Sequence, residues 1–310
     1  MHTAQFLEAQ NELVTLRDMI RWVSTQLTHS DIYLGHGTND YITEARHLTL
    51  VPLGMPITLG DLDLDARLTS TEKKEILALL EKRIFDKIPT AYLTQRAFFA
   101  DLMFYVNEHV LIPRSPIGQL ITEKLSPYAD NLVKKRKIEN EELMILDLCT
   151  GSGCIAIALA YAFENASIDA VDISFDALAV CDENIQAHQL THRVFPIQSD
   201  LFDALGHTQY DFIITNPPYV DAEDMSDLPE EFLHEPELAL ASGSDGLDIT
   251  KRILKEAKHH LKEEGFLICE VGNSMVHLID AYPHFQFEWI EFKKGGDGVF
   301  IISKSQLDLL

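Results

Sequence analysis

Hydrophobic residues in the first ninety positions are spaced as they are in helices. Apolar side chains recur every three or four residues over 13–27, which places them on one helical face. A second run starts at Ile76, and Thr69 with Glu72 matches a capping box before it. The segment 33–40 between the runs is rich in turn-forming residues. It is interpreted either as a connection between helices or as an exposed docking loop.

Pro89 ends this helical region, and a different pattern follows. Apolar and aromatic residues crowd positions 97–112 and are interrupted at Asn107-Glu108, as in a β-hairpin. The pattern predicts three parts: a helical substrate-recognition domain at 1–88, a hairpin linker at 89–115 and a larger domain at 116–310.

From Pro116 onward, strands and helices alternate. A helix begins there, and apolar runs of strand length then alternate with helical segments. This rhythm predicts an α/β fold with a mostly parallel sheet covered by helices on both faces. A hairpin around Gly295-Gly296 would place an antiparallel strand at the end of the sheet. The predicted strands are 143–148, 167–172, 193–198, 210–215, 265–271, 285–292 and 298–303.

A glycine-rich turn follows the strand at 143–148. Gly151 and Gly153, after Thr150, let the backbone approach a ligand at the start of a helix. Asp172 ends the next strand, where a carboxylate can accept hydrogen bonds from ribose hydroxyls. Read literally, Gly151-x-Gly153-x-x-Ala156 also satisfies the dinucleotide fingerprint. The loop therefore predicts a nucleoside cofactor, without choosing between NAD and S-adenosylmethionine.

Two further carboxylates favour S-adenosylmethionine. Asp147 lies four residues before the first glycine, where it could hold the cationic amino group of a methionine moiety. Asp200 follows the strand at 193–198 and could accept a hydrogen bond from an adenine amino group. Either carboxylate alone could equally be a strand-end cap or a solvated loop charge. Together with Asp172 and the turn described next, they make S-adenosylmethionine the expected cofactor.

The turn Asn216-Pro217-Pro218-Tyr219 follows the strand at 210–215 and carries the most specific chemical signal. The two prolines end the strand and fix an extended backbone. Asn216 and the carbonyl of Pro217 can then act as rigid hydrogen-bond acceptors beside the Tyr219 ring. Such a site suits a flat group that bears –NH2. We therefore expect all four residues to bind substrate, and Asn216, Pro217 and Tyr219 to act in catalysis.

Charge narrows the class of partner. The 310 residues carry a net charge of −24, whereas proteins that grip nucleic acid directly usually present a basic face. The one basic tract, 134–137, is followed closely by glutamates and is expected to be a solvated linker. An acidic surface favours a basic protein partner, so we expect no stable nucleic-acid binding.

Composition gives the expected compartment. No apolar run is long enough for a transmembrane helix, and the N-terminus lacks the features of a signal peptide. The four cysteines show no C-x-x-C pairing, and the thirteen histidines lack ligand spacing. We expect a cytoplasmic protein with reduced, buried thiols, no membrane association and no metal site.

These motifs resemble those of class I S-adenosylmethionine-dependent methyltransferases, Rossmann-like enzymes in which [DN]-P-P-[YFW] follows the fourth strand. The whole chain is similar to the HemK family of protein N5-glutamine methyltransferases. The resemblance covers the helical N-terminal domain, the hairpin that ends in Ile112-Pro113-Arg114, and the catalytic domain with its segment 235–247. It implies methyl transfer from S-adenosylmethionine to the side-chain amide nitrogen of a glutamine.

Two branches of the family differ in substrate. One modifies the Gly-Gly-Gln motif of peptide-chain release factors, and the PrmB type modifies a glutamine of the large-subunit ribosomal protein L-three. This chain resembles the second, because Ser115-Pro116 follows Arg114 where the first usually continues with Pro-Asp-Thr-Glu. The segments 17–22 and 35–38 also resemble the second branch. The resemblance implies ribosomal protein L-three as the substrate, with a release factor as the alternative.

Two enzyme classes remain as rivals. An N6-adenine nucleic-acid methyltransferase could use the same Asn-Pro-Pro-Tyr turn, but it flips a base into its site and needs a basic cleft. An NAD-dependent oxidoreductase would explain the glycine loop and leave that turn without a role. A non-catalytic cofactor-binding assembly factor is a third possibility, which the intact motif does not favour.

Overall fold

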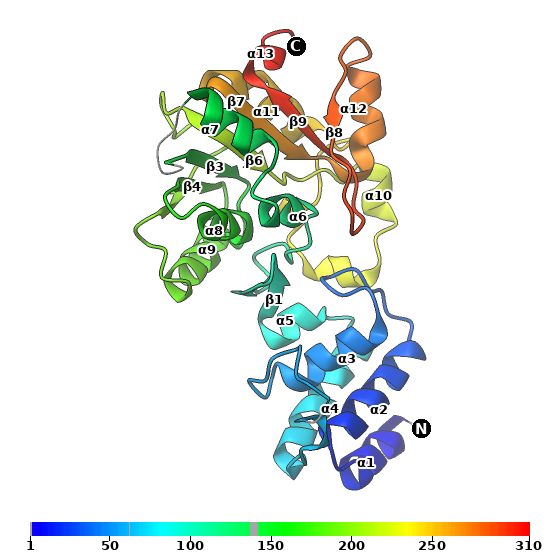
Figure 1. The fold of residues 1–310 in the computed structure, drawn as a ribbon. Coiled ribbons are helices and arrows are strands. Elements are labelled where there is room, and N and C mark those ends of the chain that lie inside the picture. Colours follow the sequence, from blue (N-terminus) through cyan, green and yellow to red (C-terminus); the bar gives the residue numbers. More distant parts are fainter. Residues whose placement is uncertain (1, 62, 137–141) are drawn as a thin grey trace. The chain divides into compact units, whose positions relative to one another are not determined.

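The computed structural model describes residues 2–61, 63–136 and 142–310 (Figure 1). The chain divides into two units, Met1–Ala97 with Pro229–His234, and Phe98–Leu228 with Glu235–Leu310. The predicted linker tract at 134–137 extends beyond the described residues at position 137. The helical unit therefore includes a short segment from late in the chain, which the sequence did not predict.

The helical unit is built from amphipathic helices. The predicted apolar face lies on α2, where Leu16, Ile20, Val23 and Leu27 are buried. The predicted capping box is present at the start of α4, where Thr69 and Glu72 bond reciprocally. Its helices are α1 (His2–Glu12), α2 (Leu16–Thr28), α3 (Tyr41–Leu50), α4 (Ser70–Phe85) and α5 (Thr90–Thr94), with a 3-10 turn η1 (Asp63–Asp65).

The segment 33–40 is a packed connection between α2 and α3. His36 and Thr38 are buried, whereas Gly37 and Asn39 are exposed. Asp40 caps α3 by accepting hydrogen bonds from the N–H groups of its first turn. The segment is therefore a connection with both inward-facing and outward-facing residues, and it is not wholly exposed as the docking-loop interpretation required.

The boundary and the hairpin differ from the prediction. Thr90 and Ala91 of α5 are buried, and the helical unit extends to Ala97 where the sequence suggested 88. The hairpin pairs β1 (Arg96–Phe99) with β2 (Leu102–Tyr105). Its turn lies at Ala100-Asp101, both with positive φ. The predicted interruption at Asn107-Glu108 is present as a turn after the end of β2, but it is not the turn of the hairpin. Asp is common in turns, but Ala at a position with positive φ gives no signal of the kind that Gly or Asn gives there.

The second unit contains a seven-stranded sheet in the order β5-β4-β3-β6-β7-β9-β8. Five strands are parallel, and β9 runs antiparallel to its neighbours. Although β9 is last in the chain, it lies between β7 and β8 and not at the edge. The strands are β3 (Met144–Leu148), β4 (Ser167–Asp172), β5 (Val194–Gln198), β6 (Tyr210–Thr215), β7 (Leu261–Glu270), β8 (Glu288–Trp289) and β9 (Val299–Ser303).

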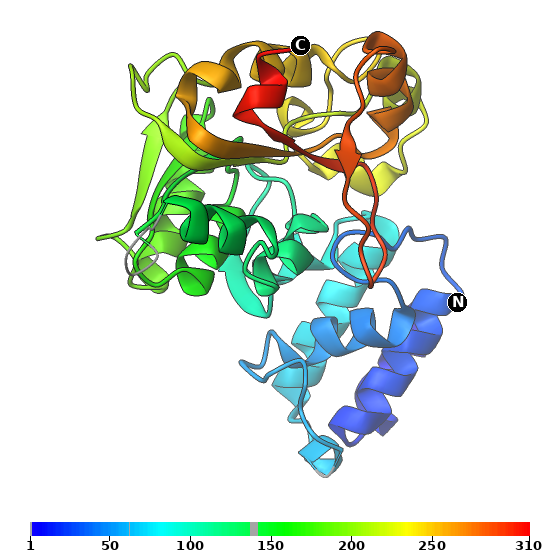
Figure 2. The same cartoon turned by 45° about the horizontal axis from the view of Figure 1, so that its top comes forward.

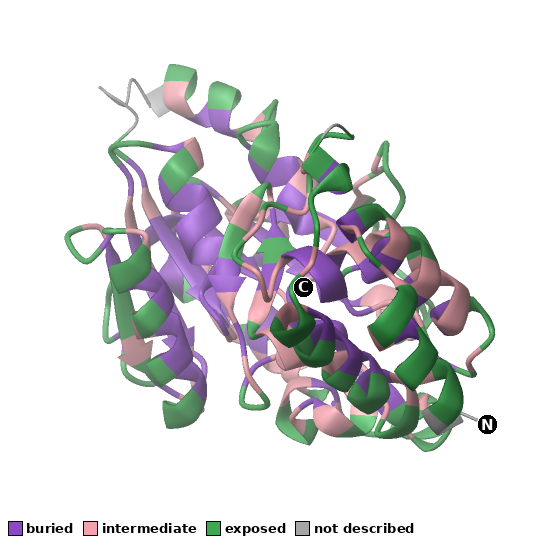
Figure 3. Cartoon of the chain, turned by 90° about the horizontal axis from the view of Figure 1, so that it is seen from below, coloured by how far each residue is buried: buried purple, intermediate pink, exposed green. Residues whose placement is uncertain are grey.

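Helices cover both faces of this sheet, as its nearly continuous apolar strands require (Figures 1 and 2). One face packs against α6 (Ile117–Thr122), α7 (Tyr128–Arg136), α8 (Cys154–Ala162) and α9 (Phe175–Ala187). The other packs against α11 (Asp248–His260), α12 (Met275–Ala281) and α13 (Lys304–Leu307). Figure 3 shows the central strands buried, with exposed residues on the outer turns of the helices.

The strand order reverses at β3, which has β4 on one side and β6 on the other. Ligands of open α/β sheets bind outside the carboxyl ends of the strands at such a point. The glycine loop follows β3, Asp172 ends β4, Asp200 follows β5, and Asn216 follows β6. The topology therefore places the predicted residues of the cofactor and substrate sites along one edge of the sheet.

Candidate active site

A cavity of about 210 Å³ lies at this edge, within the second unit. Its mixture of apolar and polar lining residues is typical of small-molecule sites. Asp147, Gly153, Pro217 and Tyr219 are not part of its described wall. The predicted residues that do line it are Thr150, Gly151, Asp172, Asp200, Asn216 and Pro218.

The glycine loop has a backbone that requires its glycines. Gly151 and Gly153 both have positive φ, a region that residues with a side chain rarely adopt. A Cβ at Gly153 would lie 2.6 Å from the sulfur of Cys181, so the close approach of α9 also demands glycine there. Helix α8 begins at the next residue, and its first N–H groups face the loop.

Asp172 ties the glycine loop to the end of β4. Its Oδ2 accepts the Gly151 N–H at 2.9 Å, and its Oδ1 accepts the Ser174 N–H at 2.9 Å. Burial raises the pKa of this carboxyl despite these bonds. The side chain lines the cavity, and each oxygen retains a lone pair for another donor. The neighbouring Ile173, 48% exposed, adds an apolar surface that the sequence analysis did not identify.

Asp147 is completely buried beneath the glycine loop. Its Oδ2 accepts hydrogen bonds from the Thr150 hydroxyl at 2.5 Å and from the Ala156 N–H at 3.0 Å. In the part of the chain that the structure describes, its Oδ1 has no hydrogen-bond partner. Burial raises the pKa of Asp147 to about 7. An unpartnered buried carboxylate oxygen fits a cationic donor, because such a group would satisfy both its charge and its hydrogen bond.

Asp200 lines the cavity and forms an ion pair with Arg252 at 2.9 Å. Both side chains are close to half exposed, so the pair is solvated and worth little to stability. Arg252 also lines the cavity and was not identified from the sequence, because it lies within α11, far from every motif. Asp200 therefore lies at the cavity wall and has a cationic neighbour there.

The Asn-Pro-Pro-Tyr turn, which follows β6, contains one hydrogen-bond acceptor that is not used. Asn216 contributes to the cavity wall, and its Oδ1 is buried without a hydrogen-bond partner among the described residues. Pro217, beside it, is buried. Buried polar atoms are normally paired, and exceptions concentrate at functional sites. The turn thus offers a prepared acceptor for a donor that comes from outside the chain.

Tyr219 is held by hydrogen bonds at its hydroxyl and its carbonyl and by close packing against Gly272. Its hydroxyl donates to Glu270 Oε1 at 3.0 Å, and its carbonyl accepts from the Ser274 hydroxyl at 2.7 Å. A Cβ at Gly272, where φ is positive, would lie 2.6 Å from the ring, so only glycine leaves room for it. Burial, with the nearby Glu270 carboxylate, raises the pKa of Tyr219, which stays a neutral donor.

A polar network that was not evident from the sequence includes two residues of the cavity wall, Arg114 and Ser115. Arg114 forms a bidentate ion pair with Glu235, with nitrogen–oxygen distances of 2.6 and 2.8 Å. Glu235 also accepts the Ile112 N–H at 3.0 Å, and Ser115 donates to Glu270. Arg114 and Glu235 both lie in segments used for the family resemblance, but their 121-residue separation concealed the pairing. This pairing joins the end of the hairpin linker to the segment after the catalytic turn.

The structure also bears on the cysteines, on metal binding and on membrane-spanning helices. All four cysteines are free thiols, and Cys149 is only partly buried because it lines the cavity. Across residues 2–61, 63–136 and 142–310, no group of three or more His, Cys, Asp or Glu side chains is placed to hold a metal ion. No helix in these ranges is long and apolar enough to cross a membrane.

Comparison with known proteins is consistent with this geometry. A family model described as the methyltransferase small domain matches residues 129–246. The ribosomal protein uL3 glutamine methyltransferase of Francisella tularensis subsp. tularensis is 43% identical over 297 residues, which cover 96% of this chain and 92% of that protein. The protein of the same name from Neisseria gonorrhoeae is 45% identical over 305 residues, or 97% and 98% of the two chains.

Solved structures resemble the chain more distantly. The hMettl16 catalytic domain in complex with MAT2A 3′UTR hairpin 6 has a TM-score of 0.49 at 16% identity, over 75% of this chain and 80% of that one. A methyltransferase from Pyrococcus furiosus has a TM-score of 0.43 at 15% identity, over 76% and 99%. The two sequence relatives are therefore the comparison that informs the function.

Proposed function

Because this chain belongs to the family of ribosomal protein uL3 glutamine methyltransferases, we propose that it methylates the side-chain amide nitrogen of a glutamine in the large-subunit ribosomal protein L-three, uL3. The methyl donor is S-adenosylmethionine. The observation that carries the proposal is the unpartnered, buried Asn216 Oδ1 at the wall of the cavity. A planar amide N–H supplies the donor that this acceptor lacks.

The cofactor residues are assigned by the chemistry each offers. Asp172 accepts from the ribose hydroxyls, and the Oδ1 of Asp147 accepts the cationic amino group of the methionine moiety. Asp200 accepts from the adenine amino group, with Arg252 holding its carboxylate in place. Thr150, Gly151 and Gly153 shape the loop over which the nucleoside lies. The bound cofactor supplies an electrophilic methyl group on a sulfonium.

The chain's own residues must overcome the weak nucleophilicity of an amide. The lone pair of the amide nitrogen is delocalised into its carbonyl. Asn216 Oδ1 and the Pro217 carbonyl accept the two N–H bonds, which orients the nitrogen and stabilises the positive charge that develops on it. Orientation of this kind can lower a barrier by roughly 7–11 kcal/mol. Tyr219, fixed by Glu270, lies in the same turn and supplies the aromatic ring that helps to exclude water from the amide plane.

The proton balance needs no strong base. As the nitrogen–carbon bond forms, the carbon–sulfur bond breaks and its electrons stay on sulfur. The methylated nitrogen then carries an extra proton and is acidic, so it loses that proton to water after transfer. Asn216 and Pro217 accept hydrogen bonds throughout and hold no proton themselves.

The helical unit is proposed to help dock a basic protein substrate. The chain carries a net charge of −24, and opposite charge speeds encounter and fixes orientation. Free uL3, or an early assembly particle in the cytoplasm, is the proposed substrate, because a glutamine buried in a finished ribosome could not reach a recessed site.

A direct competition tests the choice of substrate. Equimolar uL3 and release factor are incubated with the enzyme and limiting labelled S-adenosylmethionine, and both proteins are analysed by mass spectrometry. We expect the label on a uL3 glutamine. Label mainly on the Gly-Gly-Gln motif would support the alternative branch, and label on nucleic acid added to the mixture would support an N6-adenine methyltransferase.

A further inference from the structure

Glu270 is the last residue of β7, a strand that lies between β6 and β9 in the sheet of the second unit. On one side Cys269 pairs with Thr215 of β6, and the next residues along these two strands are Glu270 and Asn216. On the other side Glu270 pairs with Val299 of β9. Neighbouring strands therefore hold the backbone of Glu270 beside the start of the Asn-Pro-Pro-Tyr turn.

The Glu270 side chain is buried and accepts hydrogen bonds from two hydroxyl groups. Its Oε1 accepts from the Tyr219 hydroxyl at 3.0 Å, and its Oε2 accepts from the Ser115 hydroxyl. A carboxylate can accept such bonds on both oxygens at once. One side chain thus joins the turn that follows β6 to the segment that leads into α6.

The surroundings of Glu270 make these two hydroxyl bonds important. Burial raises the pKa of Glu270, and the bonds from Ser115 and Tyr219, together with the Arg114 guanidinium, offset part of this rise. Arg114 is itself engaged in the bidentate pair with Glu235. A buried polar group without its hydrogen bonds costs free energy, so the fold favours the arrangement in which both hydroxyls point at Glu270.

Both hydroxyl partners of Glu270 belong to segments that form the cavity. Ser115 lines the cavity, and its Oγ also accepts the N–H of Ile117, the first residue of α6, at 3.1 Å. Tyr219 ends the turn whose Asn216 and Pro218 line the cavity. Glu270 itself is not part of the described cavity wall. It therefore acts on the site only through the residues that it holds.

We propose that Glu270 is a positioning residue, which by holding the hydroxyls of Ser115 and Tyr219 fixes the part of the cavity wall that aligns the substrate amide. All of these residues belong to the second unit. The inference rests on the proposed methyl transfer and adds the residue that keeps the acceptor turn in place. A displacement of the reacting groups by roughly 1 Å can lower a rate by about 100-fold, so a support of this kind affects turnover.

Two substitutions at Glu270 separate the reach of the side chain from its charge. Glu270→Asp keeps the carboxylate but withdraws it by one carbon–carbon bond, about 1.5 Å, so that it cannot reach both hydroxyls. Glu270→Gln keeps the length and one accepting oxygen but replaces the carboxylate by a neutral amide. Glu288→Asp and Glu288→Gln are the matched controls, because Glu288 accepts from the Tyr128 hydroxyl at 2.6 Å and does not line the cavity.

Steady-state kinetics on uL3 give the first readout. For Glu270→Asp we expect kcat to fall by about tenfold to a hundredfold, and for Glu270→Gln we expect a smaller loss. KM for uL3 and the dissociation constant of S-adenosylmethionine should stay within about twofold, and both Glu288 variants should match the parent enzyme. A larger loss of kcat in Glu270→Gln than in Glu270→Asp would assign the effect to charge and overturn the proposal. A raised KM with unchanged kcat would overturn it as well.

A variant that leaves Glu270 intact gives the same test from the other side. Ser115→Ala combined with Tyr219→Phe removes both hydroxyl donors, and it replaces Glu270→Asp if circular dichroism shows that Glu270→Asp is not folded. We expect kcat of this double variant to fall by about tenfold to a hundredfold. Adding Glu270→Asp to it should lower kcat no further, because contacts that act as one unit are not additive. A double variant with the kcat of the parent enzyme would overturn the proposal.

A substrate-free measurement keeps the inference separate from the proposed function. The Ile117 N–H donates to Ser115 Oγ, and the Val220 N–H, next to Tyr219, donates to the Leu240 carbonyl at 2.8 Å. Hydrogen exchange at both amides should be faster in Glu270→Asp than in Glu288→Asp or the parent enzyme. Unchanged exchange would overturn the positioning role even if uL3 is methylated. Faster exchange in an enzyme that does not methylate uL3 would support the positioning role while refuting the proposed substrate.

Discussion

At the scale of single residues, two unpartnered oxygens mark where ligands bind. Asp147 Oδ1 and Asn216 Oδ1 are both buried without hydrogen-bond partners among the described residues. The first suits a cation beneath the glycine loop, and the second suits a neutral N–H at the end of β6. Because an unsatisfied buried polar atom costs free energy, both are expected to become satisfied only when cofactor and substrate are bound.

The affinity for S-adenosylmethionine should depend on pH through Asp147. Its carboxyl has a pKa of about 7, so lowering the pH below 7 protonates it and removes the charge that attracts the amino group. Isothermal titration should show weaker binding at pH 6 than at pH 8. Asp147→Asn should weaken binding by about 10- to 100-fold, as expected from roughly 1.5–3 kcal/mol for a charged hydrogen bond, and should lose this pH dependence.

The control is Asp169→Asn. Asp169 lies in β4, accepts from the Tyr210 hydroxyl at 2.6 Å and also has a pKa raised by burial, but it does not line the cavity. This variant should keep both the affinity and its pH dependence. If Asp147→Asn keeps them too, the amino group binds elsewhere.

Asn216 and Tyr219 should affect turnover more than cofactor binding. Asn216→Ala should lower kcat by about 100-fold or more, the cost of removing one group that stabilises the transition state. Tyr219→Ala should also lower kcat, and Tyr219→Phe should be milder, because the ring keeps its place against Gly272 while Glu270 loses one donor. Steady-state kinetics with uL3 and cofactor titration provide the measurement. Normal kcat in Asn216→Ala would contradict the assigned acceptor pair.

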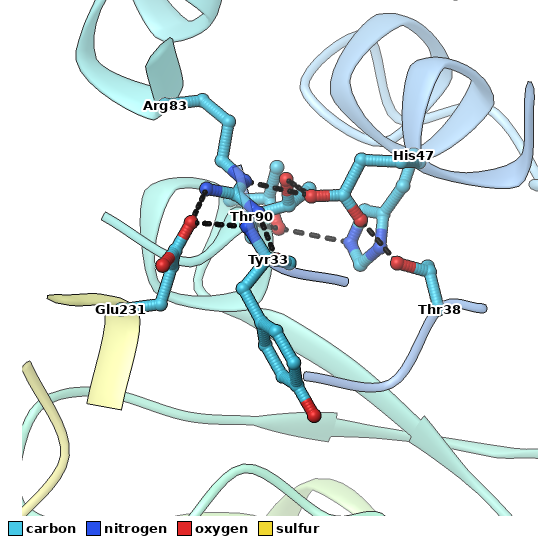
Figure 4. A network of polar contacts seen from close by, with 8 residues as sticks. Tyr33, Thr38, His47, Arg83, Thr90 and Glu231 are labelled. Carbon is cyan, nitrogen blue, oxygen red and sulfur yellow. Dashed lines mark hydrogen bonds and ion pairs between the residues drawn. The ribbon is translucent and has the colours of Figure 1, made fainter. Parts of the chain in front are cut away.

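At the scale of elements, buried polar contacts join helices that are distant in sequence. His47 of α3 lies 3.0 Å from the Thr94 hydroxyl of α5, and burial lowers the pKa of this histidine to about 4. The same helix presents Glu44 to Arg83 of α4. The helical unit therefore contains a neutral histidine, His47, close to the charged pair of Arg83 and Glu44 (Figure 4). Acid would add a charge to the histidine, whereas it would remove the charge of the glutamate.

The stability of the helical unit should fall in mild acid because of His47. Below the unfolded pKa of 6.5, the unfolded chain binds a proton that the folded chain does not bind until about pH 4. The free energy of unfolding therefore decreases as the pH is lowered from 6.5 toward 4, by about 3 kcal/mol at most. Denaturant unfolding of the parent enzyme and of His47→Gln across this range should give a difference that follows this slope. A difference independent of pH would contradict the buried neutral histidine.

Local chemistry explains which elements the sequence predicts well. The capping box at Thr69 and the strand at Ser167–Asp172 depend on neighbouring residues, and both are found where expected. The turn at Ala100-Asp101 was missed because its first residue is Ala, which rarely adopts positive φ and so does not mark a turn. The Arg83–Glu231 pair spans 148 positions, and no local pattern reports a partner so distant. The predicted site residues that end or follow β3, β4, β5 and β6 lie along one edge of the sheet, because the carboxyl ends of parallel strands meet there.

At the scale of the whole molecule, charge should govern encounter with the substrate. The chain's net charge of −24 should attract a basic protein, and salt screens such attraction over about 8–10 Å. We therefore expect KM for uL3 to rise as sodium chloride is increased from 50 to 300 mM, with kcat little changed. The affinity for S-adenosylmethionine, measured over the same range, serves as the control. A KM independent of salt would show that docking depends on apolar contacts.

The return of Pro229–His234 to the helical unit has a consequence for synthesis of the chain. A helical domain at the N-terminus would ordinarily fold as soon as it is translated. Here Arg83 and the Tyr33 N–H gain their bonds to Glu231 only after residue 231 has been synthesised. The helical unit therefore remains incomplete until much of the catalytic unit has been made. The helical unit is translated first but can complete its packing only after the catalytic turn at 216–219 has also been synthesised.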